Sequence, residues 1–94
     1  MRITGVIWLR SMVEKLEEKH QVSTVEVEEL FDRRPRLRRI ESGDVDGEDL
    51  YAALGQTRAG RYLIVFFVHK AGDQALVISA RDMSPKERRA YGEK

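Results

Sequence analysis

The sequence predicts a single α+β domain, with helices packed on an antiparallel sheet of about four to five strands. Its 94 residues fit one domain, residues 1–94. Apolar runs typical of strands and signals for helix starts follow one another in the order β-α-α-β-β-β-β-α. The segment Tyr62–Val68 is apolar at all seven positions, which is typical of a central strand covered on both faces.

The N-terminal half predicts one strand and two helices. Ile3–Leu9 is apolar and rich in β-branched residues, so we expect a first strand there. Ser11 can cap a helix that runs to His20. Ser23 and Glu26 have the spacing of a capping box and predict the start of a second helix. Pro35 limits that helix, which we expect to end at residue 32 or 33.

The C-terminal half predicts four strands and a last helix. Ser84, Pro85 and Glu87 combine an N-cap, a proline at the first helical position and a second capping box, so the last helix begins there. The strands are expected over Leu37–Ile40, Leu50–Thr57, Tyr62–Val68 and Ala75–Ala80, with a polar loop at 42–49.

Composition excludes several classes of protein. The chain has no cysteine, which rules out a disulfide scaffold, a cysteine zinc site and a thiol nucleophile. Its two histidines, His20 and His69, lack the spacing of paired metal ligands, so we expect no metal and no cofactor. No apolar run is long enough to span a membrane. We therefore expect a soluble cytoplasmic domain with no membrane partner.

Charge is unevenly distributed along the chain. The net charge is only +1, yet residues 33–39 contain five arginines and no acid. This arginine run could follow a phosphate backbone. It could equally contact an acidic partner, or the acidic loop that comes after it in the same chain.

Arg61 and Arg81 flank the predicted hairpin. If its turn is centred near residue 72, both side chains lie at the same end of the hairpin, beside the start of the last helix. Two guanidinium groups beside a helix N-terminus form a good phosphate site. The alternative is that they are sheet-end residues paired with Asp82, Glu48 or Asp49.

Lys19 and His20 stand at the end of the first predicted helix. His20 could act as a general acid or base, with Lys19 as a phosphate contact. The alternative is that His20 only stabilises the C-terminal end of the helix, where positive charge is favoured.

Four segments follow one another in an order and spacing known from one family of proteins: Lys19–Ser23, Gly60–Val65, Ile78–Arg81 and Lys86–Tyr91. Taken together, they resemble the BrnT family of toxins from bacterial type II toxin–antitoxin systems. This resemblance implies a compact RelE-like fold that cleaves RNA. It also implies a BrnA-type antitoxin, which neutralises the toxin and supplies the DNA-binding part, so that contact with DNA is only indirect.

The matching positions imply functional residues. Lys19, Lys86 and Arg88 would contact the substrate, while His20, Arg61 and Arg81 would be catalytic. The chain departs from the family at Gln21, where glycine is common, and at Leu50, where arginine is frequent.

RNA can be cut without a metal when its 2′-OH attacks the adjacent phosphate. In that mechanism Arg61 and Arg81 would stabilise the phosphorane, and His20 would be the acid–base group, with Glu48 in reserve. The missing cation at Leu50 favours an alternative function, that of an inactive BrnT-like module acting only by binding a protein or RNA partner.

Overall fold

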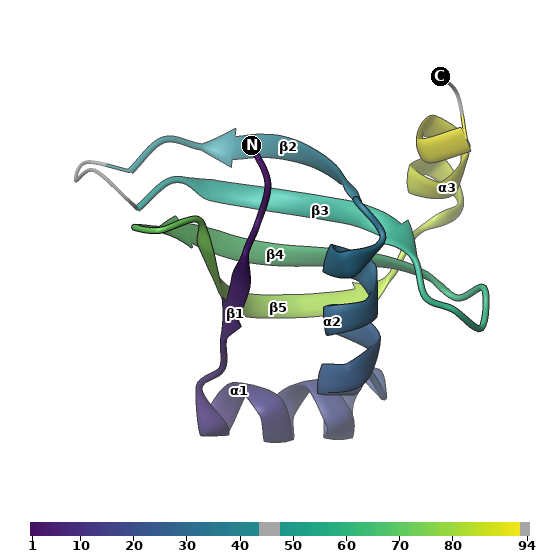
Figure 1. Cartoon of the computed structure of the whole chain (residues 1–94). Helices are drawn as coiled ribbons and strands as arrows, with labels where there is room; N and C mark the ends of the chain where they lie inside the picture. Colours follow the sequence, from purple (N-terminus) through teal and green to yellow (C-terminus); the bar gives the residue numbers. More distant parts are fainter. Residues whose placement is uncertain (44–47, 93–94) are drawn as a thin grey trace.

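The computed structural model describes residues 1–43 and 48–92. A five-stranded sheet in the order β1-β5-β4-β3-β2 forms its centre (Figure 1). The α+β class and the predicted order of elements are confirmed. The elements are β1 (Gly5–Ile7), α1 (Arg10–Lys15), the π-helical segment η1 (Leu16–His20), α2 (Thr24–Asp32), β2 (Arg36–Glu41), β3 (Leu50–Gln56), β4 (Tyr62–Lys70), β5 (Gln74–Asp82) and α3 (Pro85–Gly92).

Strand β4 is the middle strand of the sheet and is covered on both faces, as predicted. Leu63, Val65 and Phe67 point to the face covered by α1, η1 and α2, where they pack with Leu16 and Leu30. On the other face, a smaller cluster forms around Ala52, Leu54, Ile64 and Met83, with Tyr62, Phe66 and Tyr91 of α3 packed against it. Burial of the apolar side chains on both faces holds this strand in place.

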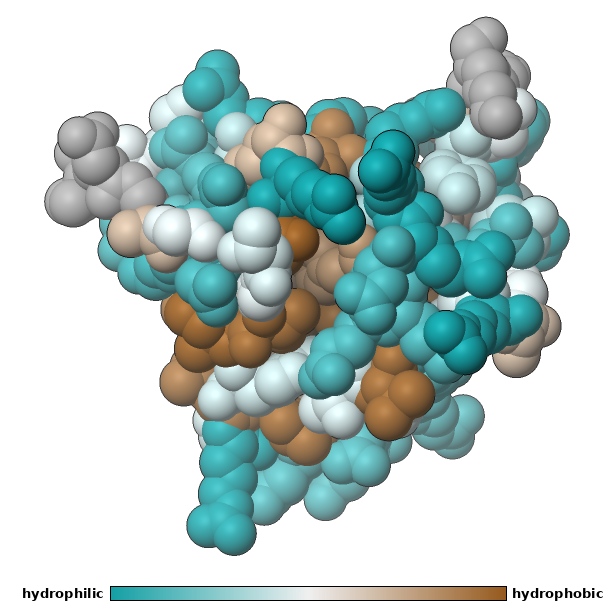
Figure 2. Space-filling model, viewed as in Figure 1, coloured by the Kyte–Doolittle hydropathy of each residue, from teal (hydrophilic) through white to brown (hydrophobic). Residues whose placement is uncertain are grey.

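Strand β1 is shorter than predicted and pairs differently. It pairs in parallel with β5 over Gly5–Ile7, whereas the other neighbouring strands are antiparallel, as predicted. The helix that follows begins at Arg10, and its N-cap is Leu9, which makes no side-chain capping bond. The predicted cap at Ser11 is therefore wrong. Figure 2 shows hydrophobic side chains gathered over β1, where Ile7 and Leu9 are exposed.

The turn between η1 and α2 depends on Gln21. Its φ of 54° lies in the left-handed region, and the Val22 N–H closes the turn on the Leu16 carbonyl at 3.1 Å. Glycine adopts this conformation without a steric cost, so the turn would also accept the glycine that the resemblance implies at this position. The turn leaves the backbone carbonyls of His20 and Gln21 outside the helix.

Both predicted capping boxes are present. At α2, the Ser23 Oγ accepts from the Glu26 N–H at 3.1 Å, and the Glu26 carboxylate accepts from the Ser23 N–H at 3.0 Å. At α3, Ser84 and Glu87 form the same pair of bonds at 3.1 and 2.8 Å. Each box fixes a carboxylate at the start of its helix.

The predicted polar loop at 42–49 falls partly on residues 44–47, which lie outside the described residues. Within the described part of the chain, no helix has the length and apolar character needed to cross a membrane.

Candidate functional site

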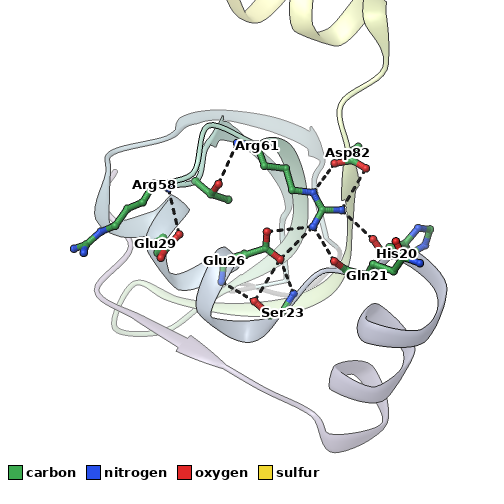
Figure 3. Close-up of polar contacts among 9 residues, drawn as sticks. His20, Gln21, Ser23, Glu26, Glu29, Arg58, Arg61 and Asp82 are labelled. Carbon is green, nitrogen blue, oxygen red and sulfur yellow. Dashed lines mark hydrogen bonds and ion pairs between the residues drawn. The ribbon is translucent and has the colours of Figure 1, made fainter.

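The guanidinium of Arg61 binds four different groups at the end of the sheet where β4 begins. Its Nε donates to Asp82 at 2.7 Å, and its Nη1 donates to the Gln21 carbonyl at 2.7 Å and to Glu26 at 3.1 Å. Its Nη2 donates to the His20 carbonyl at 3.0 Å (Figure 3). These five residues, which we call the Arg61 cluster, join β4, β5, α2 and the end of η1.

Charges in the Arg61 cluster stabilise one another. The hydrogen bond and charge of Arg61 lower the pKa of Asp82 below its usual range, against a smaller effect of burial. Burial acts to raise the pKa of Glu26, but the Ser23 N–H and Arg61 together lower it. The pKa of Arg61 is raised, chiefly by its hydrogen bond to Asp82. Two carboxylates therefore already compensate the single positive charge of Arg61.

Arg81 lies in a different place from Arg61. Its guanidinium forms a bidentate pair with Glu87, at 2.7 and 3.0 Å, and its Cζ lies 5.6 Å from the centre of the Phe66 ring. Phe66 packs against the cluster on the sheet face opposite α1 and α2, whereas the Asp82 partner of Arg61 is on the helix-covered face. Successive residues of a strand point to opposite faces, so Arg81 and Asp82 diverge.

The predicted phosphate site formed jointly by Arg61 and Arg81 is therefore wrong. A β-bulge provides the physical reason. Phe67 pairs with Val77 but Phe66 pairs with Ser79, so β5 contains one extra residue at this point. Without the bulge, Leu63 would pair with Arg81; with it, Leu63 pairs with Asp82. This shift of one residue turns Arg81 to the other face.

The alternative interpretation of the two arginines, in which they form internal ion pairs, holds for the pair Arg61–Asp82. Arg81 pairs with Glu87 and not with the predicted partners. Glu48 instead binds Lys70 at 2.6 Å, and the Asp49 carboxylate accepts from the Gly43 N–H.

The ion pair between Arg81 and Glu87 predicts acid sensitivity. The pKa of Glu87 is lowered from 4.5 to about 2, mainly because the Glu87 carboxylate accepts hydrogen bonds from Arg81. Because the folded pKa is below the unfolded one, this stabilisation is complete above pH 4.5 and is lost as the pH falls towards 2. We expect this pair to contribute about 1–2 kcal/mol, since its solvent exposure screens the interaction.

Glu87→Gln should remove this contribution at neutral pH. The free energies of unfolding in urea of the parent and of the variant should differ at pH 7, and the difference should shrink towards zero as the pH falls through 2. An equal difference at pH 7 and at pH 2 would contradict the assignment of this acid sensitivity to Glu87.

Lys19 and His20 are exposed at the end of η1. The imidazole of His20 points away from Arg61, whereas its backbone carbonyl faces the guanidinium (Figure 3). With the residues that the structure describes, neither side chain forms a hydrogen bond or ion pair. Both side chains are thus available to a molecule in solvent. They stand where η1 ends at the Gln21 turn, a segment that we call the Lys19–His20 turn and that Arg61 holds through the carbonyls of His20 and Gln21.

Lys86 and Arg88 are exposed on α3. Arg88 lies with its Cζ 4.0 Å from the centre of the Tyr62 ring, at the wall of a groove of about 950 Å³. Lys86 is not among the residues lining this groove. We call it the arginine–tyrosine groove, after its lining residues Arg34, Arg36, Arg88, Arg89, Tyr62 and Tyr91.

The resemblance implied a substrate contact for Arg88, but the sequence did not indicate that other arginines and two tyrosines form one site with it. The arginine run at 33–39 was a partial signal, because it supplies Arg34 and Arg36. Tyr62 belongs to the apolar segment that predicts a central strand, and it does pack against the smaller cluster. The pairing of β2 with β3, and of β3 with β4, brings the arginine run near the start of β4.

Comparison with known families identifies the chain. The family model described as the ribonuclease toxin BrnT of type II toxin–antitoxin systems matches residues 8–87, which is most of the sequence. A search of curated proteins found no match. The family match confirms the resemblance seen in the sequence. The chain belongs to the BrnT family of ribonuclease toxins of type II toxin–antitoxin systems.

Proposed function

We propose that this protein is a toxin endoribonuclease that cuts RNA without a metal ion, and that a BrnA-type antitoxin neutralises it. The family match over residues 8–87 carries this proposal. The exposed Lys19–His20 turn supports it, because a general acid or base that acts on a large substrate has to be accessible from solvent.

The reaction divides into one bond formed and one bond broken. The 2′-oxygen attacks the adjacent phosphorus while a base takes the 2′-OH proton. The bond from phosphorus to the 5′-oxygen breaks, and that oxygen receives a proton. The products are a 2′,3′-cyclic phosphate and a 5′-OH, with no oxidant or other reactant consumed.

Within this mechanism the residues have separate roles. His20 exchanges the protons and Lys19 contacts the phosphate. Arg61 acts as a positioning residue, since its guanidinium binds the carbonyls of His20 and Gln21 and two carboxylates compensate its charge. Arg81 does not share a phosphate site with Arg61 in this mechanism, because the two side chains lie on opposite faces of the sheet.

The test uses the purified protein and two RNAs of identical sequence, one with native ribose and one fully 2′-O-methylated, in buffer containing EDTA. We expect cleavage of the native RNA alone, with a cyclic phosphate terminus detected by mass spectrometry. Induced expression without an antitoxin should arrest bacterial growth. Cleavage of the methylated RNA, or activity that EDTA abolishes, would contradict the proposed mechanism.

A second candidate function is an inactive binding module. Leu50 favours it, because a half-buried leucine at the start of β3 replaces the arginine frequent in the family. Growth that continues during expression, together with intact RNA in the purified assay, would support this alternative.

A further inference from the structure

We propose that the arginine–tyrosine groove binds a single-stranded segment of RNA, with its phosphates on the arginines and its bases on the tyrosines. This inference rests on the proposed ribonuclease function and adds a location for the substrate. The groove lies between α3 and the sheet, on the side of the smaller apolar cluster. It is separate from the Arg61 cluster, which lies on the helix-covered face.

The charge of the groove points to a polyanion. Four arginines line it, and none of its described lining residues is acidic. Arg34, Arg88 and Arg89 form no ion pair with any carboxylate of the described residues. By contrast, Arg61 and Arg81 both have carboxylate partners. Guanidinium groups without such partners bind phosphate through several N–H donors at once.

The aromatic side chains point to unpaired bases. The rings of Tyr62 and Tyr91 lie 6.1 Å apart and nearly perpendicular, at 79°. Arg88 lies over the Tyr62 ring, and Arg36 lies 5.6 Å from the centre of the Tyr91 ring. Tyrosine rings and guanidinium planes are the groups on which unstacked RNA bases stack. These contacts also order the arginine side chains before a ligand arrives, which lowers the entropic cost of binding.

The dimensions of the groove favour one strand over a duplex. The groove has a volume of about 950 Å³, which is at the upper end of the range for sites that bind small molecules and is enough for a few nucleotides. Bases in a duplex are paired and stacked on each other, so they cannot reach the tyrosines.

The groove and the Lys19–His20 turn lie on opposite faces of the sheet, both at the end where β4 begins. Arg61 and Tyr62 are successive residues, and they point to opposite faces. In Figure 3 the Arg61 guanidinium reaches Asp82 on the strand that leads to α3 and also the carbonyls of His20 and Gln21 at the end of η1. A strand bound in the groove can therefore continue around this end of the sheet towards His20.

The experiment measures binding of a fluorescein-labelled, fully 2′-O-methylated RNA decamer by anisotropy, because this RNA cannot be cut by 2′-OH attack. Arg88→Ala/Arg89→Ala should weaken binding at least tenfold. It should also reduce the slope of log K against log salt by about 1.4, or about 0.7 for each phosphate that the variant no longer neutralises. Arg10→Ala/Lys15→Ala removes the same charge from exposed positions on α1 and should stay within twofold of the parent.

A second pair of variants tests the stacking. Tyr91→Leu should weaken binding about tenfold, whereas Tyr91→Phe, which keeps the ring, should stay within twofold. Thermal unfolding of both variants checks that α3 remains packed. Equal losses in the groove and α1 variants would overturn the proposal, because they would show attraction by overall charge. Competition by decaglutamate as strong as that by the decamer would overturn it too, in favour of an acidic protein partner.

Failure of this proposal is distinguishable from failure of the proposed function. If the parent cuts native RNA while the groove variants bind the decamer as the parent does, the groove proposal fails and the ribonuclease stands. If the parent binds the decamer through the groove but leaves native RNA intact, the groove proposal stands and the ribonuclease function fails.

Discussion

Arg61→Ala should lower the free energy of unfolding by about 2–3 kcal/mol and the melting temperature by about 10–20 °C. The substitution leaves the carboxylates of Asp82 and Glu26 without their cation. It also removes the donor of the His20 and Gln21 carbonyls. The effect is below that of a fully buried pair, because the Arg61 side chain is 26% exposed.

Urea unfolding measures this effect, and Arg58 provides the matched control. Arg58 lies in the turn just before Arg61, is exposed and points away from the cluster; only its backbone N–H binds Glu29 (Figure 3). Arg58→Ala should change the free energy of unfolding by less than about 0.5 kcal/mol. If Arg61→Ala is as stable as Arg58→Ala yet no longer cuts RNA, Arg61 contacts the substrate and the positioning role is wrong.

The fold could be predicted because its main signals are local. Ser23 with Glu26, and Ser84 with Glu87, specify helix starts within four residues. The uninterrupted apolar segment of β4 is also a local signal. It indicates a central position in the sheet, because none of its residues is suited to face solvent. Such patterns require no knowledge of which segments become neighbours.

The arrangement of the site could not be predicted, because it depends on register. The bulge in β5 between Val77 and Ser79 contains no glycine or proline from which it could be predicted, yet it determines on which face of the sheet Arg81 lies. The arginine–tyrosine groove likewise depends on long-range pairing that brings β2, the start of β4 and α3 together. Sequence spacing alone gave each side chain a position along the chain but no neighbour across the sheet.

The second large effect is expected for His20→Ala, which should reduce the rate of RNA cleavage by about 10²–10⁴. Stability should stay within about 0.5 kcal/mol of the parent, because the exposed imidazole forms no hydrogen bond with the described residues. Alanine still supplies the backbone carbonyl that Arg61 binds. Loss of activity without loss of stability separates His20 from Arg61, whose replacement affects both.

Initial rates on a labelled RNA between pH 5 and 9, together with urea unfolding, provide the measurement. The matched control is His69→Ala, because His69 is bound to Asp73 at 2.9 Å beside the β4–β5 turn, at the other end of the hairpin from Arg61. The control should cut RNA at the parental rate. In His20→Ala, the pH profile of the residual activity should lose the ionisation of the acid–base group. A His20→Ala protein that cuts as fast as the parent, or whose pH profile is unchanged, would remove His20 from the chemistry and leave the Lys19–His20 turn a structural feature held by Arg61.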